Sequence, residues 1–114
     1  QAWRAAAKAG SKKPSQSASP RAAKWLGTSR DGYCQRTQDE GTCANGDKGS
    51  FSLAKELDWA AAAEACLNRC DQCARCRYIS VSANFHDCSW FFTCNLARLQ
   101  SDVPGFASGA LVST

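Results

Sequence analysis

The sequence contains no methionine, only one histidine and no long hydrophobic run. Its longest strongly apolar cluster, residues 90–92, is far shorter than the roughly 20 residues that a transmembrane helix requires. We therefore expect a membrane-peripheral protein rather than a membrane-spanning one. At 114 residues, the chain is long enough for one small domain and too short for a large enzyme core.

Residues with catalytic potential are also scarce. The sequence has no phosphate-binding loop and no nucleophile elbow. His86 and Asp87 are adjacent in sequence, so their side chains would tend to diverge, and no base can be assigned to Ser89. We predict a protein that is not an enzyme, with no catalytic residue, no metal ligand and no cofactor.

Acidic residues are absent from the first 30 positions, which contain seven Lys and Arg residues. The other seven and all ten acids lie in residues 31–114, so a basic segment precedes a mildly acidic domain. The composition is typical of a transit peptide or of a disordered tail. We predict an extended basic arm over residues 1–32, which needs a partner to become ordered. Its candidate partner-binding residues are Trp3, Arg4, Lys8, Lys12, Lys13, Arg21, Lys24, Trp25 and Arg30.

Eight cysteines are present, about seven per hundred residues, which is near the range of stapled secreted domains. Four of them fall in "CLNRCDQCARC", residues 66–76. This spacing lacks the fourth cysteine of a ferredoxin-type run, and no second knuckle completes a zinc site. The two C-x-x-C pairs follow a predicted helix, whose C-terminal dipole opposes a thiolate.

An even cysteine count in a small, turn-rich chain favours disulfides over metal or redox chemistry. We therefore predict an oxidising compartment. Nucleic acid is not expected as a partner, because such compartments rarely contain it and residues 31–114 are acidic overall. The predicted disulfide cysteines are Cys34, Cys43, Cys66, Cys70, Cys73, Cys76, Cys88 and Cys94.

One helix and one hairpin stand out. Asp58 is a good N-cap for a helix over 58–70, and "RYISVS" (77–82) and "CSWFFTC" (88–94) are typical of paired strands. We predict an α+β fold, with one main helix packed on a short antiparallel hairpin or sheet. The disulfide-stapled module spans 33–100, with an irregular segment at 33–56, a helical turn at 95–100, and an extended tail over 101–114.

The aromatic residues of the second strand must divide between its two faces. At least one of Trp90, Phe91 and Phe92 therefore points away from the core. An exposed aromatic side chain there would mark a contact surface. We include Phe91 and Phe92 among the candidate partner-binding residues.

The C-x3-C helix, the cysteine before "RYISVS" and the "CSW" strand resemble the core of PAN/apple-type domains. The resemblance implies the disulfides Cys66–Cys88 and Cys70–Cys76, with Cys34–Cys94 as an outer pair and Cys43–Cys73 as the remainder. The longer string "CLNRCDQCARCRYISVS…DCSWFFTCNL" also resembles cysteine-rich modules of predicted proteins from dinoflagellates and related algae.

These features lead to two expectations of function. The first is a structural or interaction subunit of a larger assembly, whose partners are other protein subunits. The algal resemblance and the transit-like arm specify it as a peripheral subunit of a photosystem I–antenna supercomplex in the thylakoid lumen of a chloroplast. The second is a secreted, extracellular PAN/apple-like recognition module that binds protein or carbohydrate.

Overall fold

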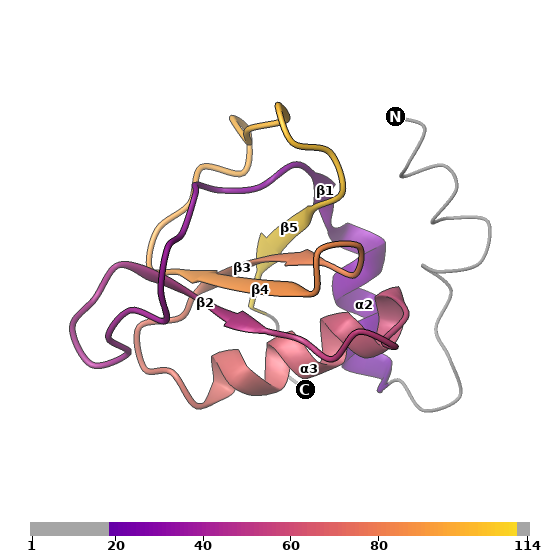
Figure 1. The fold of residues 1–114 in the computed structure, drawn as a ribbon, viewed down its shortest axis with the longest axis horizontal. Coiled ribbons are helices and arrows are strands. Elements are labelled where there is room, and N and C mark those ends of the chain that lie inside the picture. The colour runs from indigo at the N-terminus through magenta and orange to yellow at the C-terminus, as the bar shows by residue number, and fades with distance from the viewer. Residues whose placement is uncertain (1–18, 112–114) are drawn as a thin grey trace.

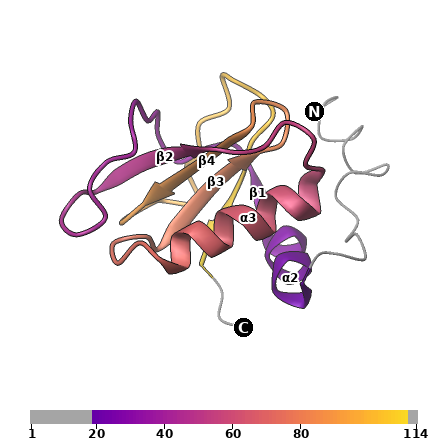
Figure 2. The same ribbon diagram turned by 60° about the horizontal axis from the view of Figure 1, so that its bottom comes forward.

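The computed structural model describes residues 19–111. Within that range the chain forms two helices and a five-stranded antiparallel sheet with strand order β1-β5-β3-β4-β2. Figure 2 shows both helices on one side of this sheet. In chain order the elements are α2 (Pro20–Thr28), β1 (Arg30–Asp31), β2 (Lys48–Ser52), α3 (Trp59–Asp71), β3 (Tyr78–Ser82), β4 (Asp87–Phe91) and β5 (Ala107–Ala110).

The main helix, α3, begins where the sequence predicts. The Asp58 side chain accepts a hydrogen bond from the amide of Ala61 at 2.8 Å, which satisfies one free donor of the first turn. Alanines then give a strong helix propensity and a smooth surface that packs closely on its neighbours. Ala60, Ala62 and Ala63 are each 0 % exposed. The predicted helix at 58–70 is confirmed, shifted by one residue.

The predicted hairpin is also confirmed, since β3 pairs antiparallel with β4. Side chains alternate along each strand, and the register of the hairpin aligns this alternation between strands, so the sheet has two distinct faces. The helix face, which packs against α2 and α3, includes Ile79 opposite Trp90 and Val81 opposite Cys88. The opposite side, named the loop face here, contains the serines at positions 50, 80, 89 and 108.

The end of the predicted basic arm belongs to the domain, which corrects the prediction of an extended segment through residue 32. Ser19 caps α2 by accepting from the amide of Ala22, and Pro20 suits the first helical position. Trp25 is 0 % exposed and packs over Gly109 of β5. The sequence prediction weighed acid-free composition and missed the amphipathic pattern of this short helix.

The C-terminal tail predicted at 101–114 contains another element of the domain. Strand β5 lies between β1 and β3, and its Ala107 and Ser108 are both 0 % exposed. Likewise β2, inside the segment predicted to be irregular, pairs with β4 along its whole length. Residues 95–100 contain a hydrogen-bonded turn instead of a helical one. The module predicted at 33–100 therefore gains elements at both ends.

Candidate functional site

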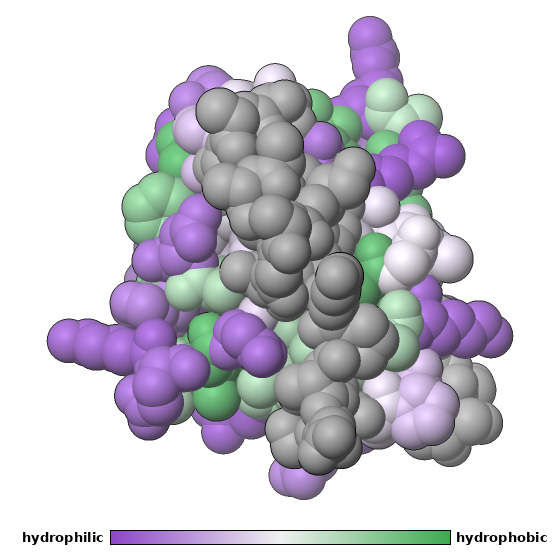
Figure 3. All heavy atoms as spheres, turned by 90° about the vertical axis from the view of Figure 1, so that its right-hand side faces the viewer, coloured by the Kyte–Doolittle hydropathy of each residue, from purple (hydrophilic) through white to green (hydrophobic). Residues whose placement is uncertain are grey.

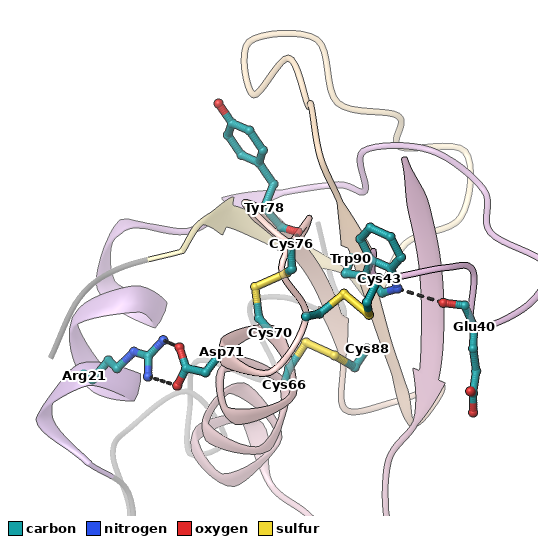
Figure 4. Close-up of a disulfide and its surroundings, with 11 residues drawn as sticks. Arg21, Glu40, Cys43, Cys66, Cys70, Asp71, Cys76, Tyr78, Cys88 and Trp90 are labelled. Atoms are coloured by element: carbon teal, nitrogen blue, oxygen red, sulfur yellow. Dashed lines mark hydrogen bonds and ion pairs between the residues drawn. A yellow bond between two sulfur atoms is a disulfide. The ribbon is translucent and has the colours of Figure 1, made fainter. Parts of the chain in front are cut away.

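The eight cysteines form four disulfides, and no cysteine in the described part of the chain is free. Cys66–Cys88 joins α3 to β4, and Cys70–Cys76 joins the end of α3 to the chain that enters β3 (Figure 4). Residues 66–76 are therefore the junction of the helix with the sheet. The remaining bridges are Cys43–Cys73 and Cys34–Cys94, so all four pairs are those that the resemblance to PAN/apple domains implied.

Residues 19–111 contain no group of three or more His, Cys, Asp or Glu side chains that could hold a metal ion. Within the same range, no helix is long and apolar enough to cross a membrane. The longest, α3, has 13 residues.

The predicted partner-binding residues of the arm have different environments. Arg21 forms two 2.6 Å hydrogen bonds with the Asp71 carboxylate, which join α2 to the end of α3 (Figure 4). The same contact lowers the pKa of Asp71 from its usual range. Trp25 is buried, whereas Lys24 and Arg30 are exposed. Trp3, Arg4, Lys8, Lys12 and Lys13 lie outside the described residues.

The aromatic residues of β4 are less available than predicted. Trp90 is buried on the helix face, and its indole N–H donates to the Glu40 carbonyl at 2.9 Å. Phe91 points to the loop face but is only 1 % exposed, so it does not offer the predicted contact surface. Phe92 is half-buried, with the Arg75 guanidinium 3.7 Å from its ring centroid.

One hollow on the loop face combines polar and aromatic walls. We name it the loop-face cleft; its volume is about 400 Å³. It lies between β4, the loop that follows β1 and the segment that leads into β5. Its polar and aromatic lining includes Tyr33, Thr37, Phe85, Asp87, Ser89 and Phe106.

A row of side chains from β4 and the facing loop forms the polar side of the cleft. The hydroxyls of Thr37 and Ser89 are 2.9 Å apart, and the Ser89 hydroxyl donates to Asp87 Oδ2 at 2.6 Å. Burial raises the pKa of Asp87, because removal of water disfavours the charged carboxylate, and the bond from Ser89 opposes that rise. The cleft therefore holds a half-buried acid with a hydroxyl partner.

The aromatic wall is built from the β3–β4 turn and from the segment before β5. The amide of Phe85 donates to Ser82 Oγ at 2.9 Å, and His86 takes a left-handed φ of 56°, which together shape the turn. The Phe85 ring stacks on Phe106 at 5.7 Å and is still 54 % exposed. Gly105 lies directly against it, since a Cβ there would be 3.2 Å from the ring.

The rim of the cleft contains an ion pair. Arg36 is 2.7 Å from the Asp102 carboxylate, which also accepts a 2.5 Å hydrogen bond from the Tyr33 hydroxyl. That hydrogen bond lowers the pKa of Asp102 and raises the pKa of Tyr33. Asp102 thus provides the countercharge for Arg36 at the rim.

A wider hollow of about 870 Å³ lies beside the Cys34–Cys94 bridge. Arg98 is its only charged lining residue. On the side of the molecule drawn in Figure 3, the described surface is mostly hydrophilic, with hydrophobic atoms in small separate areas. The wider hollow has no acidic lining residue, whereas the loop-face cleft combines Asp87 with the aromatic rings of Phe85 and Phe106.

Comparison of the chain with protein-family models, with curated proteins and with solved structures found no match.

Sequence reasoning did not find the cleft. From the sequence, Asp87 and Ser89 were weighed only as catalytic residues. No role was predicted for Tyr33, Thr37 or Phe106. One signal was present: Phe85 is a large apolar residue flanked by Asn84, His86 and Asp87 in a turn. The contact between this turn and residues 33–38 depends on long-range packing that no local pattern encodes.

Proposed function

We propose that this domain is a non-catalytic interaction module, whose work is to attach to other protein subunits in an oxidising compartment. The observation that carries the proposal is the set of four disulfides, which use all eight cysteines. Disulfides of this density are typical of secreted or lumenal domains, where they stabilise a small core.

The more specific proposal is a peripheral, lumenal subunit of an algal photosystem I–antenna supercomplex. It is supported by the resemblance of residues 66–96 to cysteine-rich algal modules and by the acid-free composition of residues 1–30. Lys24 and Arg30 are exposed on the described part of that basic segment. Such cations can approach an acidic subunit surface.

Native gel electrophoresis of solubilised thylakoids tests this proposal, with an antibody against the domain. We expect the chain to co-migrate with photosystem I and to cross-link through lysines of residues 1–30 to a neighbouring subunit. Recovery of the chain only from a secreted or cell-surface fraction would contradict the chloroplast assignment.

A second candidate function is that of an extracellular recognition module for protein or carbohydrate. The loop-face cleft favours it, because an aromatic wall beside polar groups is a common arrangement in ligand sites. A glycan array would test the carbohydrate form, with saturable binding that Phe85→Ala abolishes as the supporting result. Absence of any saturable signal would contradict that form.

A further inference from the structure

The carboxylate of Asp87 has no cationic partner among the described residues. Its Oδ2 accepts from Ser89, and no described side chain donates to Oδ1. The two residues opposite Asp87 in the sheet, Ser52 and Ser82, do not ionise. Arg36 is the only Lys or Arg that lines the cleft, and it is paired with Asp102. Asp87 Oδ1 can therefore accept a hydrogen bond from an external donor.

The wall beside this acid suits a positive charge. Phe85 presents its ring to solvent and is held in place by Phe106 and Gly105. The face of an aromatic ring attracts ammonium and guanidinium groups, most strongly where water is partly excluded. The same chain already stacks guanidinium groups on aromatic rings, with Arg75 over Phe92 and Arg69 over Phe51.

We propose that the loop-face cleft binds the cationic end of a lysine or arginine side chain from a partner protein. Asp87 accepts hydrogen bonds from the cationic group, and the Phe85 ring packs against the aliphatic part of the bound side chain and attracts its positive charge. This inference rests on the proposed interaction function and specifies the chemistry by which the partner is recognised.

The hydrogen bonds within the cleft favour a cation over a neutral sugar. Sugar hydroxyls need acceptors and donors together, but the hydroxyls of Thr37 and Ser89 are already engaged with each other and with Asp87. The group without a described donor is an acceptor, Asp87 Oδ1. An ammonium or guanidinium offers donors only and therefore matches it.

Titration of the ¹⁵N-labelled chain with blocked single residues tests the inference. The probes are the Nα-acetyl methylamides of lysine and arginine, with that of norleucine as the uncharged control and methyl glucoside and methyl galactoside as sugars. We expect saturable amide shifts confined to the cleft for the two cations only. Norleucine binding equal to lysine, or sugar binding tighter than either cation, would overturn the proposal.

Two variants sharpen the test. Asp87→Asn keeps an acceptor for Ser89 but removes the charge, and we expect affinity for both cations to fall at least about tenfold. Asp47→Asn, the matched control, makes the same change at an exposed acid that pairs with Arg75 away from the cleft. It should leave affinity unchanged. Equal affinities for Asp87→Asn and the wild type would overturn the proposal.

The wild-type chain provides a reading that needs no variant. Binding should weaken as the pH falls and Asp87 becomes protonated, in parallel with the titration of its own side-chain resonance. Affinity that is constant across this range would contradict the role of Asp87. All these readings use the isolated chain, so their failure leaves the photosystem proposal open, and recovery from a secreted fraction leaves the cleft inference open.

Discussion

The two faces of the sheet differ in the side chains that are buried on them. The helix face holds three fully buried tryptophans, Trp25, Trp59 and Trp90, together with the Cys66–Cys88 bridge. The loop face holds buried serines instead, and Ser80 and Ser108 are 2.7 Å apart through their hydroxyls. Each face has a disulfide, but tryptophan packing dominates the helix face, whereas hydrogen bonds to buried serines fix the backbone of the loops on the other face.

This difference separates stability from recognition. Ser80 accepts from the amide of Cys34, and Ser108 donates to the carbonyl of Gly32, so these polar contacts and the Cys34–Cys94 bridge anchor the loop over the cleft. Substitutions on the helix face should therefore strongly destabilise the domain. Substitutions at the cleft should change binding and leave the fold intact.

The largest effect should come from removing the bridge on the helix face. The double substitution Cys66→Ala with Cys88→Ala opens the loop that this disulfide closes, whose ends are 22 residues apart in sequence. It also leaves a cavity between α3 and β4. We expect a loss of about 5 kcal/mol in the free energy of unfolding. Urea denaturation of the folded variants measures it.

The matched control removes the bridge of the loop face, with Cys34→Ala and Cys94→Ala. Its sequence separation is 60 residues, so loop entropy alone predicts a loss of about 4 kcal/mol. Cys94 is partly exposed, so little cavity energy adds to this value. A greater loss for this variant than for the helix-face bridge would show that loop length, and not burial, sets the order.

Trp25→Ala should have the next largest effect. The side chain is 0 % exposed and fills the space over Gly109, so its removal leaves a large cavity. We expect a loss of about 3 to 4 kcal/mol by urea denaturation. Lys24→Ala, one residue earlier on the exposed side of α2, should change stability by less than about 0.5 kcal/mol. Equal effects of the two would mean that α2 is not part of the core.

Local sequence patterns were sufficient to predict the elements in which capping, propensity and periodicity agree. Asp58, the alanines and the alternation of residues 78–82 predicted α3 and β3 because capping, propensity and period agree there. The helix α2 was missed because a nine-residue helix is not stable alone and depends on Trp25 docking against β5. Strand β5, "ASGA", has little β-propensity and is a strand because it lies between two others.

The cleft was beyond local signals for a similar reason. Its floor comes from β4 and its walls from residues 33–38, the β3–β4 turn with Phe85, and residues 103–106. Alternation along β4 places Asp87 and Ser89 on one face, which the sequence does encode. The arrival of Thr37 and Phe106 above them depends on loop paths held by Cys34–Cys94 and the buried serines.

Loss of the Arg21–Asp71 pair should have a smaller effect than these changes. The Arg21 side chain is 9 % exposed, but that of Asp71 is 43 % exposed, so water screens the pair. For Arg21→Gln we expect a loss of about 1 kcal/mol by urea denaturation at neutral pH.

The pH dependence of this pair has a definite sign. The folded-state pKa of Asp71 is lowered, so its contribution is complete above the ordinary aspartate pKa and disappears as the pH falls through the folded value. The difference in stability between Arg21→Gln and the wild type should therefore shrink in acid. A difference that is constant with pH would show that Arg21 acts only through packing.

Asp87→Asn should have the smallest effect on stability, with the opposite sign. Burial raises the pKa of Asp87, so its favourable contribution is present below the ordinary aspartate pKa and is lost as the pH rises through the folded value. At neutral pH the variant should therefore be more stable, by less than about 1 kcal/mol after screening. Urea denaturation of both chains across the acidic range measures this, and the gain should vanish at low pH. A clear loss of stability at neutral pH would mean that the carboxylate supports the fold, which would remove the contrast between a face built for stability and a face built for binding.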